Sequence, residues 1–154
     1  KFKKFKIIEA KAKETRLLKK DILKSNLIPA GCIDIHQDDE VRKGDFYIYI
    51  FDKRKEYEKI MKKADKIALR CRNIVSKNFD VNDVEFNDSI DSQGFIKIHD
   101  GTITDLFYRF GTKYSITIET STNTKLNKVC NINRLFIKEI INLIADSKQT
   151  DKKL

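Results

Sequence analysis

The run Phe46-Tyr-Ile-Tyr-Ile-Phe51 constrains the fold more than any other part of this 154-residue chain. A strand formed here is apolar on both faces, so neither face is suited to contact with water. Such a strand belongs inside a sheet that is covered on both sides. Helical and extended patterns alternate along the rest of the chain, which is typical of α/β proteins. We therefore predict an α/β fold: a mixed, largely parallel sheet with helices on its faces.

A first helix is predicted over residues 13–25. Its apolar residues Leu17, Leu18 and Ile22 are expected to face inward. The helix should stop before Pro29, because proline and the residue before it are poorly accommodated in a continuing helix.

A long helix is predicted over residues 57–75. Its apolar residues recur at three- and four-residue steps, and we interpret this stripe as part of the core. Residues 78–92 are rich in Asp and Asn and have little periodicity, so a long loop is expected there. A last helix is expected over residues 131–145, followed by a polar tail at 147–154 that should fray.

One carboxylate stands out as a candidate functional group. After a turn at Asp100-Gly101 and an amphipathic segment that ends at Gly111, a strand is predicted at residues 114–118, and Glu119 lies at its end. An acid at the end of an apolar strand can line a cleft. It can also simply mark where a buried strand meets solvent.

A second strand end carries a candidate metal ligand. The segment Gly31-Cys-Ile-Asp-Ile-His36 follows Pro29 and ends in a histidine. A neutral imidazole nitrogen can bind zinc while the other ring nitrogen is held by a neighbour. A histidine at such a position can equally be a hydrogen-bonded polar residue with no metal, so His36 alone decides nothing.

Together, and in this order, the two segments resemble the C-terminal half of the zinc metallocarboxypeptidase family, the carboxypeptidase A-like enzymes and their bacterial relatives. Residues 33–38, Ile-Asp-Ile-His-Gln-Asp, look like the segment that carries the family's third zinc ligand. Residues 113–119, Lys-Tyr-Ser-Ile-Thr-Ile-Glu, resemble the strand that carries its general-base glutamate. The elements between them also fit, so the resemblance covers residues 13–145.

This resemblance implies a zinc-dependent hydrolase that cleaves a C-terminal peptide bond or a related amide bond. His36 would bind the cofactor Zn2+, and Glu119 would be the catalytic general base for zinc-activated water. Residues 13–146 would form the C-terminal part of a carboxypeptidase-like catalytic domain, preceded by a basic segment at 1–12. Two alternatives stay open: an acylase of the aspartoacylase or succinylglutamate desuccinylase type, which shares the fold, and a degenerate non-catalytic binding module. The substrate-binding residues are unknown.

The chain also departs from the family pattern. The family's first two zinc ligands come from a His-x-x-Glu motif, which this sequence lacks. Its Asn133-Arg134 pair lies in the predicted last helix, far too late to be the family's carboxylate-binding Asn-Arg. The chain begins with Lys1. We therefore expect the missing N-terminal half of the same domain to be a partner that supplies the remaining site residues and covers an otherwise unpaired sheet edge.

Charge does not point to a nucleic-acid partner. The net charge is +9, from 32 basic and 23 acidic residues, and such surfaces attract phosphates. The basic residues are nevertheless spread over predicted helix faces and the termini, without an accompanying aromatic stacking platform. No apolar segment is long enough to span a membrane. We expect binding neither to nucleic acid nor to membrane.

Three cysteines, Cys32, Cys71 and Cys130, cannot all pair within one chain. Buried free thiols are the expected state, and none of them forms a Cys-x-x-Cys zinc pattern. Free thiols favour a reducing compartment, and the expected location is cytoplasmic.

Overall fold

A computed structural model describes residues 13–25, 27–39, 44–70, 78–81, 84–87, 90–97 and 102–150. The helices and strands follow one another as α1 (Lys13–Ser25), β1 (Gly31–Asp38), β2 (Phe46–Ile50), α2 (Arg54–Ala64), β3 (Asn78–Val81), β4 (Val84–Asn87), β5 (Phe95–Lys97), α3 (Ile103–Arg109), β6 (Tyr114–Ser121) and α4 (Leu126–Thr150).

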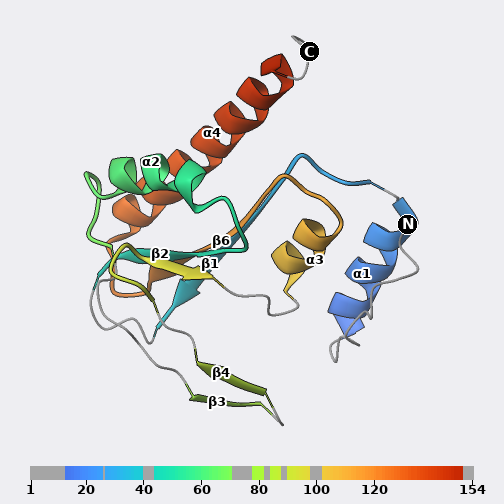
Figure 1. The fold of residues 1–154 in the computed structure, drawn as a ribbon. Helices are drawn as coiled ribbons and strands as arrows, with labels where there is room; N and C mark the ends of the chain where they lie inside the picture. Colours follow the sequence, from blue (N-terminus) through green and yellow to red (C-terminus); the bar gives the residue numbers. More distant parts are fainter. Residues whose placement is uncertain are drawn as a thin grey trace.

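Four strands form the main sheet in the order β1-β6-β2-β5, and β3 and β4 form a separate two-stranded sheet (Figure 1). Strand β1 runs parallel to β6, and β2 runs parallel to β5. The central pair, β6 and β2, is antiparallel. The sheet is therefore mixed and largely parallel, and the predicted α/β class is confirmed.

Helices α2 and α4 lie together over one face of this sheet (Figure 1). Strand β2 sends Phe46, Ile48 and Ile50 into the core beneath them, where each is at most 1% exposed. The alternate residues of β2, Tyr47 and Tyr49, belong to a second apolar cluster that includes Ile90 and Ile96. Both faces of β2 are thus covered and the strand lies inside the sheet, as its uniform apolar character predicted.

Helix α3 covers the beginning of the opposite face of β6. Thr102 caps the helix by accepting a hydrogen bond from the backbone N–H of Asp105. The Thr104 hydroxyl lies 2.9 Å from that of Thr117, and the Ser115 hydroxyl donates to the Thr104 carbonyl at 2.7 Å. Because these contacts involve the first half of β6, α3 covers that half of the face. The predicted turn at residues 100–101 lies outside the described residues.

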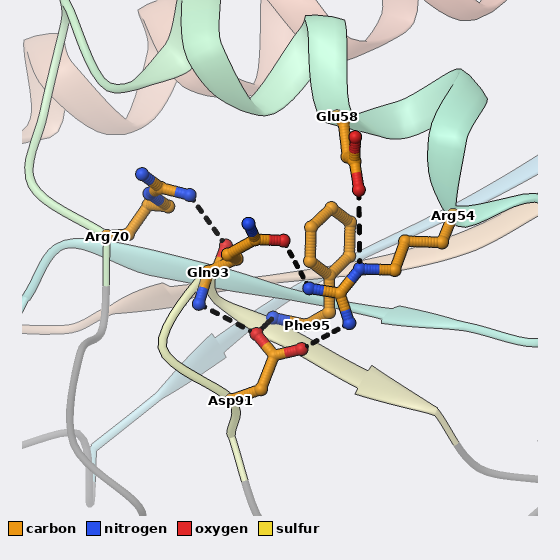
Figure 2. Close-up of polar contacts among 6 residues, drawn as sticks. All are labelled: Arg54, Glu58, Arg70, Asp91, Gln93 and Phe95. Carbon is orange, nitrogen blue, oxygen red and sulfur yellow. Dashed lines mark hydrogen bonds and ion pairs between the residues drawn. The ribbon is translucent and has the colours of Figure 1, made fainter.

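A polar cluster ties the segment before β5 to the start of α2 (Figure 2). The Arg54 guanidinium donates to Asp91 at 2.6 Å and to the side-chain oxygen of Gln93, and it lies 4.7 Å from the ring centroid of Phe95. Arg70 donates to the Gln93 carbonyl at 3.1 Å. Arg54 and Arg70 thus both bind the turn before β5, and these contacts hold β5 next to α2.

The prediction of one helix over residues 57–75 is wrong beyond Ala64, where α2 ends. The chain turns there, and an isolated bridge joins Arg70 to strand β2. Ala68 is buried in the core even though it lies outside the helix. The apolar residues of this turn continue the three- and four-residue spacing of the helix. The sequence pattern alone therefore did not show that the helix ends at Ala64. Residues 71–75 lie outside the described parts.

The predicted loop over residues 78–92 is also wrong in part, because β3 and β4 form an antiparallel hairpin within it. The register pairs Phe79 with Phe86 and Val81 with Val84. These four β-formers alternate with polar residues, and their strand preference outweighs the Asp and Asn content that suggested a loop.

Helix α1 has the predicted bounds, but its predicted inward face is wrong for two residues. Leu17 and Leu18 are 52% and 49% exposed, and α1 lies well away from α2 and α4 (Figure 1). An amphipathic pattern shows which face prefers burial, but not whether another element is present to bury it. The basic segment at residues 1–12 lies outside the described residues.

Helix α4 is longer at both ends than the predicted 131–145. Residues 147–150 of the predicted polar tail continue it, and 151–154 are outside the described residues. The prediction of buried thiols is wrong for Cys130, which is exposed on α4, while Cys32 is partly buried.

Candidate functional site

The two predicted site residues lie side by side. In the parallel ladder between β1 and β6, His36 and Glu119 are direct Cα partners. Partners in a ladder project from the same face of the sheet, and neighbouring strands lie about 5 Å apart. Both side chains therefore leave the sheet together, on the face opposite the core under α2 and α4. Their roles as metal ligand and general base remain predictions.

Neither residue closes its strand. Strand β6 continues past Glu119 to Ser121, and β1 continues past His36 to Asp38. The expectation that Glu119 marks the end of its strand is therefore wrong. Because the two strands are parallel, the pair still lies near the carboxyl ends of both strands, the sheet edge at which α/β proteins commonly bind ligands.

The carboxylate of Asp34 contacts the imidazole ring of His36. His36 Nε2 lies 3.0 Å from Asp34 Oδ1, two residues earlier on the same face of β1. The His36 side chain is 53% exposed and that of Asp34 is 32% exposed. A proton on Nε2 that is donated to Asp34 leaves the Nδ1 lone pair of a neutral ring available. Histidines that bind metals commonly use one nitrogen as the ligand and give the other to a carboxylate in this manner.

Tyr47 is a neighbour of this pair that the sequence analysis did not identify. It is the Cα partner of Glu119 on the other side of β6, and its hydroxyl donates to Asp38 Oδ2 at 2.7 Å. Burial raises the pKa of the Tyr47 phenol far above its ordinary range, and Tyr49, Asp38 and Glu119 add to the rise. The phenol is therefore a neutral hydrogen-bond donor beside the carboxylate. The alternation of Tyr47 and Tyr49 with core residues was the signal that both share a face.

The same face carries a thiol deeper in the sheet. Cys32 is the Cα partner of Ser115, at the end that α3 covers. Burial raises the pKa of the Cys32 thiol to about 11. A thiol with so high a pKa is protonated at neutral pH and is a poor nucleophile, so we assign it no catalytic role.

Among the described residues, the prediction of a metal ligand concerns His36 alone. Within those parts of the chain, no three or more His, Cys, Asp and Glu side chains gather closely enough to hold a metal ion. His36, with its carboxylate partner, has the donor chemistry of a single zinc ligand. Asp38 is already engaged by Tyr47, and Glu40 lies outside the described residues.

No helix in the described residues has both the length and the apolar character needed to cross a bilayer.

Comparisons with known proteins show the fold. No protein-family model and no curated protein matches the chain. One similar crystal structure is a "putative metallopeptidase" from Shewanella amazonensis SB2B, with a TM-score of 0.58 and 16% sequence identity over 86% of this chain and 48% of that one. Another, a protein with the same description from Shewanella denitrificans OS217, has a TM-score of 0.59 and 14% identity over 87% of this chain and 48% of that one.

These likenesses show that the chain shares a mixed α/β fold with part of each of the two structures. The chain spans about half the length of the two structures. The carboxypeptidase A family in particular rests on the sequence resemblance alone.

Proposed function

We propose that this chain is part of a metal-dependent hydrolase that cleaves a C-terminal peptide bond or a related amide bond. Glu119 serves as the general base and His36 as one zinc ligand. The observation that carries this proposal is the pairing of His36 with Glu119 on one face of the sheet, where Asp34 also contacts the imidazole ring. The metallopeptidase-like fold supports it.

Each residue has a task that its position suits. Asp34 orients the His36 ring and favours the tautomer in which Nδ1 is free of a proton. Glu119 accepts a proton from the attacking water and later gives one to the leaving amine. When bound, zinc polarises the scissile carbonyl and makes its water more acidic. Tyr47 limits access of solvent to one side of Glu119, since it is 3% exposed and lies directly across the ladder.

The rest of the centre comes from outside this chain. Catalytic zinc sites normally have three protein ligands and one open position. With one candidate ligand, residues 1–154 alone are expected to hold zinc weakly or not at all. The remaining ligands and the group that binds the substrate carboxylate belong to the other half of the domain.

The test compares two glutamines in the full-length gene product. Glu119→Gln keeps the size of the side chain but cannot accept a proton, so turnover should fall by about 10²–10⁴-fold while bound zinc stays the same. Glu139→Gln is the matched control, because Glu139 lies on α4 and pairs with Lys63 at 2.8 Å, on the other side of the sheet. Its turnover should remain normal.

Turnover is measured on peptides with a free carboxyl terminus and on N-acyl amino acids, and zinc is measured by elemental analysis. His36→Ala should lose metal as well as turnover, because removal of a direct ligand opens the site. Near-normal turnover in Glu119→Gln would show that Glu119 is not the general base. Full zinc content in His36→Ala would eliminate the ligand.

A further inference from the structure

A side-chain hydrogen bond joins two strands that are not neighbours in the sheet. Tyr47 lies on β2 and Asp38 lies on β1, and β6 runs between these strands. The Tyr47 hydroxyl nevertheless donates to Asp38 Oδ2 at 2.7 Å. Neighbouring strands lie about 5 Å apart, so this contact spans roughly 10 Å of the sheet. We call the two side chains and their hydrogen bond the Asp38–Tyr47 bridge.

The strand register shows where the bridge crosses β6. Tyr47 is the Cα partner of Glu119, and Asp38 is the Cα partner of Ser121. These residues all project from the face opposite the core under α2 and α4, because ladder partners share a face and side chains alternate along a strand. The bridge therefore passes diagonally over β6, between the side chains of Glu119 and Ser121.

Exposure along β6 agrees with this crossing. Glu119 is partly exposed, and every other residue of the strand is buried. Ser121 is 1% exposed, as expected for a residue beneath the bridge. On the other side of Glu119, Thr117 is 6% exposed and is the Cα partner of Tyr49, whose ring meets that of Tyr47 edge to face at 5.6 Å between centroids. Glu119 is thus the one position of β6 that is open on this face.

These neighbours limit the directions that the Glu119 carboxylate can take. Tyr47 stands beside it on β2, and the bridge closes the space toward the end of β6. The remaining direction is toward β1, where His36 is its Cα partner and has a 53% exposed side chain. A base that is already held in its productive geometry needs less reorganisation during a reaction.

The single proton of the phenol is donated to Asp38. Burial raises the pKa of the Tyr47 phenol far above its ordinary range, so this proton stays on the phenol. Glu119 therefore receives no hydrogen bond from the Tyr47 hydroxyl. The bridge acts on Glu119 by contact and by confinement.

We propose that Tyr47 and Asp38 are positioning residues for the general base Glu119, and that their bridge keeps its carboxylate turned toward His36. The inference rests on the proposed function. Both residues act indirectly, since neither has to touch the substrate or the metal. Loss of a group that orients a functional side chain typically costs about 10–100-fold in activity.

Turnover of the full-length gene product tests this role, on peptides with a free carboxyl terminus and on N-acyl amino acids. Tyr47→Phe keeps the ring and removes the bridge, so kcat should fall by about 10–100-fold while KM changes by less than about twofold. Asp38→Ala should have the same effect. The double variant should be no slower than the slower single variant, because all three lack the same hydrogen bond.

Two further variants separate positioning from stability. Tyr108→Phe is the matched control, because the Tyr108 hydroxyl donates to Asp52 Oδ2 at the same 2.7 Å, at the other end of β2. It should lower stability by a similar amount and leave kcat normal. Asp38→Asn keeps an oxygen that can accept the hydrogen bond from Tyr47, so it should recover most of the turnover that Asp38→Ala loses.

Nuclear magnetic relaxation of the Glu119 side chain tests the positioning without hydrolysis. Its methylene signals are assigned by their loss in Glu119→Gln. We expect an ordered side chain on the picosecond to nanosecond timescale in the unmodified protein. This order should be lost in Tyr47→Phe and kept in Tyr108→Phe.

Normal kcat in Tyr47→Phe would overturn the inference. A rise in KM alone would also overturn it, by assigning Tyr47 to substrate binding, and so would a Glu119 side chain that stays ordered without the bridge. If the order of Glu119 depends on the bridge but the unmodified protein hydrolyses neither class of substrate, the positioning stands and the proposed function alone is rejected.

Discussion

Replacement of Asp91 by alanine should lower the free energy of unfolding by about 2–3 kcal/mol. Asp91 Oδ1 accepts hydrogen bonds from the backbone N–H groups of Gln93 and Phe95, at 2.8 and 3.1 Å, and Oδ2 accepts one from Arg54 at 2.6 Å (Figure 2). Each backbone hydrogen bond contributes about 1 kcal/mol. The ion pair adds about 0.5–1 kcal/mol, because the Arg54 and Asp91 side chains are 43% and 34% exposed and solvent screens them.

Asp91→Asn separates these two contributions. Asparagine keeps an oxygen acceptor for both backbone N–H groups but loses the charge that attracts Arg54, so its cost should stay below about 1 kcal/mol. Asp21→Ala on the exposed surface of α1 is the control and should change stability by less than about 0.5 kcal/mol. Urea denaturation followed by circular dichroism gives all three values. If Asp91→Asn costs as much as Asp91→Ala, the backbone hydrogen bonds do not stabilise the turn, and the reasoning fails.

Three further outcomes are expected. Phe136→Ala should cost about 3–5 kcal/mol in urea denaturation, because its side chain is fully buried and leaves a cavity; a loss below about 1 kcal/mol would contradict the described core. Tyr47→Phe should cost about 1–2 kcal/mol through loss of the hydrogen bond to Asp38, and unchanged stability would mean that this bond contributes nothing. Iodoacetamide at pH 8 should label Cys130 faster than Cys32, because Cys130 is exposed while burial raises the pKa of the Cys32 thiol to about 11; peptide mass spectrometry showing the reverse order would contradict this.

The sequence by itself determined the fold class and the position of β2 inside the sheet. Apolar residues at every position of β2 required cover on both sides, and alternation of helical and extended patterns required an α/β arrangement. It also supplied His36 and Glu119 as candidates, because each follows an apolar strand pattern. Each of these patterns lies within one short segment of the chain, so the sequence of that segment is enough to recognise it.

Only the tertiary structure decided what these residues meet. Strand pairing is not local, so no pattern in either segment could show that His36 lies opposite Glu119, or that Tyr47 flanks the glutamate from β2. Helical spacing could not show that α2 stops at Ala64, because apolar residues of a turn can pack into the same core. Nor could the apolar pattern of α1 show that Leu17 would remain exposed, since burial depends on whether another element lies against that face.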